Sequence, residues 1–338
     1  MSRASIVGML VAAEVLIVGV ALYALGGRPG GFHGPIFAGG LHDADFVAKS
    51  VAPIEAGDAP RIAVDDPDSR IVVAASNDGL VHVKDLTNVR GAMFTDGGSV
   101  PQLNVRHTGD GVAISRHESN GSGLHFGIGS FDQRVEIDAP PGSHIDIARC
   151  AGADVSAIQG GVAVRSQDGR ISLADLRGTV EGRTQDGSIS ASRVHGDTLA
   201  LQSANGHLSL SDVAVSSLNA RTSDGSIEAR GLAIGGGTQP QAVLHSDDGS
   251  IRADGSFAPG GSYEISTQNG SIRLGLAPNA DLTVNASTGN GKVLVDGSPF
   301  ENSDGDSVRH TVKLGSGSGN LQLSSGDGSI HILTNGAV

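Results

Sequence analysis

A short polar pattern recurs through the middle of the chain at nearly constant spacing. It reads RSQDGRIS from Arg165, RTQDGSIS from Arg183 and RTSDGSIE from Arg221, and looser copies begin at His245 and Ser266. The glycine of each copy gives the anchor positions Gly169, Gly187, Gly206, Gly225, Gly249, Gly270 and Gly291. Successive anchors lie 18, 19, 19, 24, 21 and 21 residues apart, which is the length of one coil in a repeat protein. The spacing therefore predicts a fold built from stacked units.

Three further columns accompany the anchors. The residue before each glycine is Asp or Asn, the residue three before it is Ser or Thr, and the residue two after it is aliphatic. An Asp/Asn-Gly pair tolerates the positive backbone angles of a tight turn, and a nearby hydroxyl can bond the turn amides. We expect the aliphatic residue to begin a strand and face inward. The acid and amide column is Asp168, Asp186, Asn205, Asp224, Asp248, Asn269 and Asn290.

Two architectures fit this pattern. In a parallel β-solenoid each unit of 18–24 residues forms one coil, and equivalent side chains stack about 4.8 Å apart. In a meander of hairpins the Asp-Gly pairs would reverse an antiparallel sheet. Identical columns favour the solenoid, because hairpins need complementary rather than identical partners. We predict an all-β domain over 61–338, with an irregular start at 61–149, regular repeats at 150–300 and C-terminal coils at 301–338.

Composition limits the core and the partners. The chain of 338 residues contains 51 glycines, no tryptophan and 3% aromatic residues, so its interior must be thin and aliphatic. A formal net charge of −13 would repel phosphate backbones, which predicts that nucleic acid is not a partner. The only cysteine, Cys150, cannot form an internal disulfide, and we predict a buried free thiol.

The N-terminal segment predicts a membrane span. After a tail of residues 1–3, residues 4–27 carry one charge, Glu14, and are long enough to cross the hydrocarbon core as a helix. Arg3 favours an N-terminus inside, which gives a single-pass cell-membrane protein with its C-terminal domain periplasmic or extracellular. Cleavage of the segment as a signal peptide is the alternative, since Ala24 and Gly26 are small. Residues 28–60, rich in Gly and Pro, predict a flexible linker.

The residues around the first repeats resemble a known family. The stretch VEIDAPPGSHIDIARCAGADVSAIQGGVAVRSQDGRISLADLRG, from Val135, is similar to the bacterial β-strand-repeat candidate adhesins, a family of unknown function. The likeness covers roughly residues 60–335. It implies an envelope-facing β-solenoid, often tethered by a single span, with roles in adhesion or envelope stress. The family offers no agreed site residues. Here Asp or Asn precedes most anchors, where many relatives carry Ser-Gly.

Residue chemistry gives no catalytic, cofactor-binding or metal site. Metal ions need several oxygens converging on one point, whereas acids on neighbouring coils are about twice as far apart as a coordination bond, so we interpret the Asp column as a structural turn. The arginines of a partial column are Arg165, Arg183 and Arg221, and they suit surface ion pairs or contact with an acidic polymer. His33, His42 and Asp43 make a weak metal motif.

The function predicted from these features is a non-enzymatic, membrane-tethered envelope scaffold for adhesion or interaction, binding a protein partner or an envelope polymer. No cofactor is expected. We also expect a homo-oligomer through the C-terminal coil, where residues 329–338 would leave an unpaired strand. One alternative is an envelope-stress sensor coupled through Glu14, and another is a polysaccharide-active β-helix enzyme that uses the arginine column.

Overall fold

A computed structural model of the chain describes residues 45–94, 102–116, 126–300 and 307–334. Every regular element in these ranges is a β-strand, which confirms the all-β prediction. Across the same ranges, no helix has the length and hydropathy needed to cross a membrane. The tail 1–3, the predicted span 4–27 and residues 28–44 of the predicted linker lie outside the described residues.

The described chain forms 23 strands. The first seven are β1 (Asp45–Ser50), β2 (Arg61–Ala75), β3 (His82–Phe94), β4 (Leu103–Thr108), β5 (Gly111–Arg116), β6 (Phe126–Ala139) and β7 (His144–Ser156). The next ten are β8 (Gly161–Arg165), β9 (Ile171–Arg177), β10 (Val180–Thr184), β11 (Ile189–Ser203), β12 (Leu208–Thr222), β13 (Ile227–Ile234), β14 (Gln241–Ser246), β15 (Ile251–Phe257), β16 (Ser262–Thr267) and β17 (Ile272–Leu276). The last six are β18 (Leu282–Thr288), β19 (Val293–Val295), β20 (Ser298–Phe300), β21 (Val308–Lys313), β22 (Gly319–Ser325) and β23 (Ile330–Leu333).

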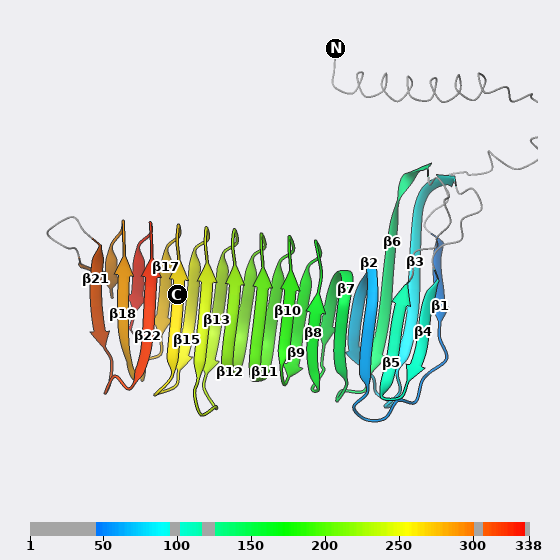
Figure 1. The fold of residues 1–338 in the computed structure, drawn as a ribbon, viewed down its shortest axis with the longest axis horizontal. Coiled ribbons are helices and arrows are strands. Elements are labelled where there is room, and N and C mark those ends of the chain that lie inside the picture. The colour runs from blue at the N-terminus through cyan, green and yellow to red at the C-terminus, as the bar shows by residue number, and fades with distance from the viewer. Residues whose placement is uncertain (1–44, 95–101, 117–125, 301–306, 335–338) are drawn as a thin grey trace, which may run out of the picture. The chain divides into compact units, whose positions relative to one another are not determined.

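Consecutive coils pair in parallel along two ladders (Figure 1). The first ladder contains β8, β10, the C-terminal halves of β11 and β12, β14 and β16. The second ladder contains β9, the N-terminal halves of β11 and β12, β13, β15 and β17. Each Asp/Asn-Gly turn joins a first-ladder strand to a second-ladder strand. The predicted parallel solenoid is therefore confirmed over 161–276, and the hairpin meander is wrong for this region.

The columns read from the sequence align in space. Ile189 pairs with Ile171 on one side and with Leu208 on the other, and the same register continues through Ile227, Ile251 and Ile272. Because parallel stacking places like side chains one above another, one residue choice per column fills the interior of every coil.

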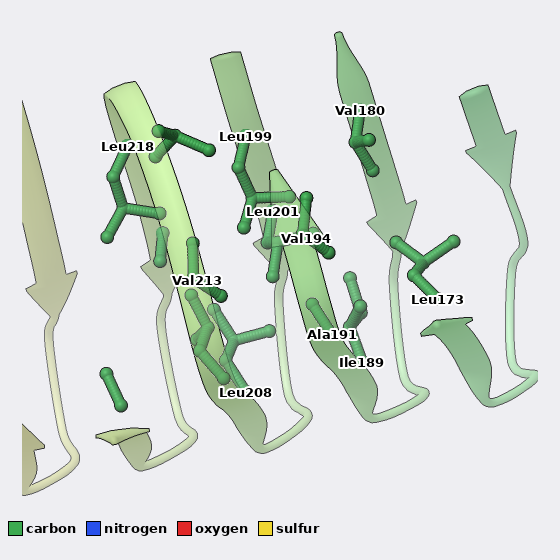
Figure 2. Packing of buried hydrophobic residues seen from close by; sticks show 14 of the residues in the cluster. Leu173, Val180, Ile189, Ala191, Val194, Leu199, Leu201, Leu208, Val213 and Leu218 are labelled. Carbon is green, nitrogen blue, oxygen red and sulfur yellow. The ribbon is translucent and has the colours of Figure 1, made fainter. Parts of the chain in front are cut away.

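The core is a narrow aliphatic column between the two ladders (Figure 2). Leu199, Leu201 and Leu218 of the first ladder and Val194 and Val213 of the second are all buried. Each fully buried aliphatic side chain of this size contributes about 1.5–3 kcal/mol relative to exposure. Many small increments of this kind hold the stack together without large aromatic rings. Cys150 is free and buried, as predicted.

The C-terminal coil is inserted into the stack. β22 pairs with β16 on one side and β18 on the other, while β23 lies between β17 and β19. The chain therefore skips one position after β17, builds β18 and β19, and returns to fill the gap. The expectation that residues 329–338 leave an unpaired strand is wrong for β23, because both of its edges are occupied. The outer strands at this end are the antiparallel β21 and β20.

The N-terminal end uses the same device. β2 lies between β7 on one side and β5 and β6 on the other, so the first coil in the sequence is also interior in the stack. β3 adds antiparallel to β6, and β1 adds to β3. Residues 61–149 therefore start the same sheet system, as expected. Residues 45–50 of the predicted linker form β1, so this part of the linker prediction is wrong.

A buried ion cluster fixes the N-terminal coils. Arg116, at the end of β5, donates from Nε to Asp66 at 2.9 Å and from Nη2 to Asp85 at 2.7 Å. The Arg116 side chain is 3% exposed, and the two carboxylates raise the pKa of its guanidinium against the opposing effect of burial. Three separate strands, β2, β3 and β5, are thus joined by one cation.

Candidate functional site

The anchor glycines form a column of close backbone contacts at the turn edge. A methyl group added at Gly206 would lie 1.8 Å from the carbonyl oxygen of Gly187, and one at Gly225 would lie 2.0 Å from that of Gly206. None of the seven anchors has a positive φ angle. The predicted reason for these glycines is therefore wrong: they allow coils to approach. The geometry of a hairpin turn does not apply here, because each turn connects strands of two different ladders and not two strands that pair with each other.

Gly79 marks the contrast. It lies in the sequence SNDGL, which starts at Ser76 and also contains an Asp-Gly pair, and it has a φ of +74°. A methyl group added to it would meet no other atom within 4 Å. Here the glycine serves a left-handed turn, which is the role expected from the sequence. The same Asp-Gly pair thus serves two purposes in this chain: a left-handed turn, and close contact between the backbones of neighbouring coils.

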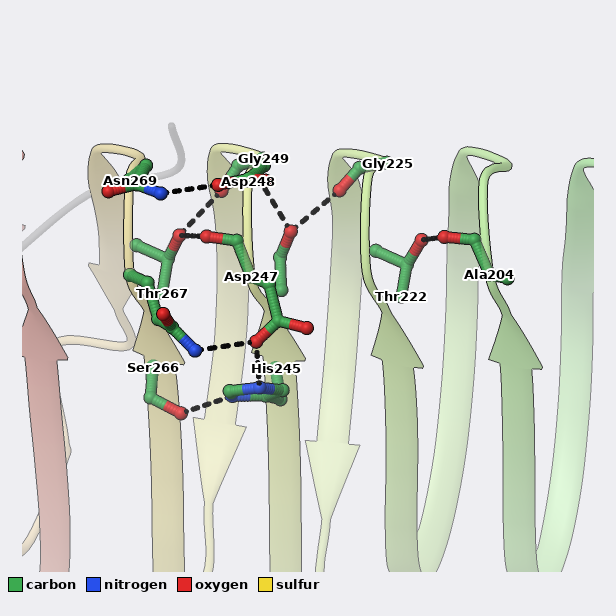
Figure 3. Close-up of polar contacts among 12 residues, drawn as sticks. Ala204, Thr222, Gly225, His245, Asp247, Asp248, Gly249, Ser266, Thr267 and Asn269 are labelled. Atoms are coloured by element: carbon green, nitrogen blue, oxygen red, sulfur yellow. Dashed lines mark hydrogen bonds and ion pairs between the residues drawn. The ribbon is translucent and has the colours of Figure 1, made fainter.

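The hydroxyl column links each turn to its neighbour. Ser203 Oγ accepts the Gly206 amide at 2.8 Å and donates to the Gly187 carbonyl, one coil away, at 2.9 Å. Thr222 and Ser246 donate in the same way to the carbonyls of Gly206 and Gly225, and Figure 3 shows the equivalent contact of Thr267 with Gly249. The expected bond from the hydroxyl to the turn amide is confirmed, and the second bond, to the neighbouring coil, extends it.

The Asp/Asn column is also used between coils. Asn205 donates its amide to Asp186, and Asn269 donates to Asp248 (Figure 3). Asn290 donates to Asp327 at 2.6 Å, because the inserted coil places Asp327 beside it. Each asparagine therefore follows an aspartate in the stack and interrupts the run of carboxylates. Among the described residues, no group of three or more His, Cys, Asp or Glu side chains is arranged to hold a metal ion.

The predicted arginine column lies on the outer face of the first ladder and is largely neutralised. Arg183 Nε lies 2.6 Å from Glu181, and Arg165 lies 3.7 Å from Asp146 and 3.9 Å from Glu181. These side chains are about half exposed, so the pairs are surface pairs of small energy. Arg221 instead donates to the Asn219 side chain at 2.9 Å. The structure thus brings Arg165 and Arg183 together with acids.

A serine, a histidine and an aspartate meet further along the same face (Figure 3). His245 Nδ1 lies 2.8 Å from Ser266 Oγ, and His245 Nε2 lies 3.1 Å from Asp247 Oδ1. The three roles of a hydrolytic triad need an accessible nucleophile and free donors for an oxyanion. Ser266 is 7% exposed, and its strand β16 is paired on both sides, by β14 and β22. This pairing occupies the backbone donors of β16, and the hydrogen bond between His245 and Ser266 joins two neighbouring coils.

A groove of about 690 Å³ runs along the opposite edge, where the coils turn the corner between ladders. Small residues such as Ala214, Ala233 and Ala258 line it, together with Asp281. Hydrogen bonds from Ser318 and Ser316 and from the amides of residues 317 and 318 lower the pKa of Asp281 to about 2. Its carboxylate therefore holds the 316–318 turn through these hydrogen bonds.

Sequence reasoning missed two arginines on the second ladder. Arg252 and Arg273 each stand three residues after an anchor glycine, in the copies DDGSIR and QNGSIR. They are exposed and lie directly opposite each other on adjacent coils. The sequence shows that arginine recurs at this position. It does not show the order in which the coils stack, which decides which residue lies next to the pair. His33, His42 and Asp43 lie outside the described residues.

Comparison with known proteins agrees with the repeat pattern. The sequence model of the Toastrack DUF4097 family matches residues 60–333. No curated protein matches the sequence. A solved candidate lipid-binding protein from Parabacteroides distasonis is 12% identical, with a TM-score of 0.41, covering 84% of this chain and 96% of its own. A candidate adhesin from Parabacteroides merdae is 11% identical, with a TM-score of 0.34 and coverages of 85% and 95%. One from Bacteroides fragilis is 12% identical, with a TM-score of 0.29 and coverages of 85% and 97%. The family match, and not these distant structures, assigns the chain.

Proposed function

This chain belongs to the Toastrack DUF4097 family, and from that membership we propose that it is a non-enzymatic interaction scaffold of the cell envelope, tethered to the membrane by residues 4–27. The domain that follows is periplasmic or extracellular, and it acts in adhesion by presenting its outer faces to a protein partner or an envelope polymer. Binding by a face uses area and repetition instead of one pocket.

One observation carries the proposal. The polar side chains at the Asp/Asn-Gly turns form hydrogen bonds between neighbouring coils, as Ser203 and Asn205 illustrate. On both outer faces, by contrast, equivalent residues of successive coils lie side by side. A surface of aligned, half-exposed side chains suits a long partner that makes many weak contacts. Within the part of the chain that the structure describes, the arrangement most similar to a catalytic site is the one around Ser266, which is nearly buried and hydrogen-bonded between strands.

Location is tested on the full chain in its native membrane. The expected result is that the chain sediments with membranes, that protease added outside the inner membrane removes residues 61–338, and that deletion of residues 4–27 releases the protein. A domain that stays protected until the membrane is dissolved would contradict the proposed orientation.

Adhesion is tested by comparing cells that produce the full chain with cells that produce residues 1–60 alone. We expect retention on surfaces coated with isolated envelope material only for the full chain, and equal retention would overturn the scaffold role. Exchange of residues 4–27 for an unrelated apolar span should leave retention unchanged, because a passive tether needs only an anchor. Loss of an envelope-stress response after that exchange would instead support a sensor coupled through Glu14.

The absence of enzymatic activity is tested with a fluorophosphonate probe on the detergent-solubilised chain. We expect no labelling, because Ser266 is covered and its neighbouring backbone donors are paired. Labelling that disappears in Ser266→Ala would establish a nucleophilic serine and reject the non-enzymatic assignment.

A further inference from the structure

A row of two arginines and one histidine crosses three coils on the outer face of the second ladder. The register places Glu228 beside Arg252, Arg252 beside Arg273, and Arg273 beside His331. Neighbouring strands of a sheet are about 4.8 Å apart, so the two guanidinium groups belong to adjacent rungs of one ladder. His331 reaches this row only because the C-terminal coil is inserted next to β17.

The two arginines lack the acidic partners that neutralise the other face. Across the described residues, neither Arg252 nor Arg273 forms an ion pair or a side-chain hydrogen bond. The nearest acid in the row, Glu228, accepts from Arg230 on its own strand. Asp254, two residues beyond Arg252, accepts the Gly231 amide at 3.0 Å. Two like charges on adjacent rungs oppose each other, and an anion that contacts both would relieve that repulsion.

His331 supplies a different contact. Burial, and then the positive charge of Arg273, lower the pKa of its imidazole. A neutral imidazole at pH 7 can donate or accept a hydrogen bond without adding a third repelling charge. The row therefore combines two permanent cations with one neutral polar group.

The row lines a concavity of about 310 Å³. The lining adds the turn serines Ser226, Ser250 and Ser271, which stand two residues before Glu228, Arg252 and Arg273 on successive coils. Its isoleucines, such as Ile251 and Ile272, are at most 1% exposed and face the core. The accessible surface consequently consists of guanidinium, imidazole and hydroxyl groups along the direction in which the coils stack, together with the Glu228 carboxylate, which is paired with Arg230.

This chemistry selects among polyanions. Single-stranded nucleic acid stacks its bases on aromatic side chains, and this lining contains no Phe, Tyr or Trp, only the imidazoles of His207 and His331. A lipid surface needs exposed apolar side chains to enter it, and the apolar side chains here are buried. Carboxylates suit the planar fork of arginine, and sugar hydroxyls suit the serines. Resting on the interaction role proposed above, we propose that Arg252 and Arg273, with His331 and the adjacent serines, bind a carboxylate-bearing polysaccharide that runs along the stack.

The test uses the full chain in detergent and polygalacturonate as the probe, with binding measured at low and moderate salt. The variant Arg252→Gln/Arg273→Gln removes the unpaired arginines, and Arg165→Gln/Arg183→Gln is the matched control, since it removes the same charge from the paired column. We expect the first variant to bind at least about tenfold more weakly, because it loses two charge-assisted contacts, and the control to bind like wild type. Unchanged melting temperatures check that both variants fold.

Three results would overturn the proposal. Wild type could fail to bind polygalacturonate, both double variants could weaken equally, or neutral dextran or oligo(dT) could bind as tightly as polygalacturonate. The cell-retention and protease assays separate this inference from the function on which it rests. If cells with the full chain are retained but the chain does not bind polygalacturonate, the binding row is rejected and the scaffold function stands. If the chain binds polygalacturonate specifically but the domain is never exposed outside the membrane, the scaffold function is rejected and the binding row stands.

Discussion

The hydroxyl of Thr222 lies 2.9 Å from the carbonyl oxygen of Gly206 and donates its hydrogen across the gap between two coils. Thr222 is 3% exposed, so water cannot replace this bond. The contact explains why the residue three before each anchor is Ser or Thr: the position needs a short side chain that can donate to the neighbouring turn.

Thr222→Val tests this bond, because valine keeps the shape and removes the donor. We expect the free energy of unfolding to fall by about 1–2 kcal/mol, the cost of leaving a buried carbonyl without its partner. Thr198→Val, at a half-buried position on β11 where the described residues offer its side chain no hydrogen bond to lose, should change stability by less than about 0.5 kcal/mol. Urea unfolding of both variants measures the difference in stability. Equal losses would mean that the hydrogen bond of the Thr222 hydroxyl does not stabilise the fold.

Gly206→Ala tests the close approach of the coils. The added methyl group would overlap the Gly187 carbonyl, so the coils must separate, and we expect a loss of about 3 kcal/mol. Gly79→Ala adds the same methyl group in open space at a left-handed residue, and should cost only about 1 kcal/mol of backbone strain. Thermal and urea unfolding would show the order. A milder effect at Gly206 than at Gly79 would mean that the coils are not in contact at their turns.

Arg116→Met tests the buried ion cluster. Removing the cation leaves Asp66 and Asp85 facing each other in the interior, and we expect a loss of about 3–5 kcal/mol. Arg149→Met removes an exposed arginine that lies 2.7 Å from Asp65, and should cost less than about 1 kcal/mol. Comparable losses in the two variants would show that burial does not strengthen the dependence on this cation.

The Asp281 turn predicts a pH dependence with a definite sign. The pKa of this carboxyl is about 2 in the folded chain, against an ordinary value of 3.8, so its stabilising contribution is complete above about pH 4. That contribution is lost as the pH falls from about 4 toward 2, because protonation removes the acceptor for Ser318 and Ser316. Carbon-detected NMR titration of the Asp281 carboxyl should give a midpoint near 2. A midpoint at or above 3.8 would contradict the hydrogen-bond arrangement.

The sequence predicted the regular part of this fold because stacking makes it local and repetitive. Once the anchors are aligned, the column of Ile171, Ile189 and Leu208 marks the buried positions, and column identity separates the solenoid from a meander. The sequence alone could not show why glycine is required at each of these positions. A backbone that needs a left-handed turn, as at Gly79, and a backbone that touches its neighbour, as at Gly206, both select glycine.

The ends of the stack were beyond sequence reasoning. Parallel repeats suggest that coils stack in chain order, and nothing in the letters around Ile330 shows that β23 enters between β17 and β19. The insertion satisfies both edges of the last coil, an advantage that exists only in three dimensions. Because the stacking order could not be predicted, the candidate binding site could not be predicted from the sequence either. Arg252 and Arg273 could be read as a repeat column, but their junction with His331 depends on the inserted coil.

Cysteine pairs measure that insertion directly in the full chain with Cys150→Ala. A disulfide needs Cα atoms about 4.4–6.8 Å apart, a condition met by neighbouring rungs and not by rungs two coils apart. Under mild oxidation, we predict rapid crosslinking of Arg273→Cys with His331→Cys and none of Arg273→Cys with Leu294→Cys. Crosslinking of the second pair in place of the first would mean that the coils stack in chain order, contradicting both the inserted coil and the binding row that includes it.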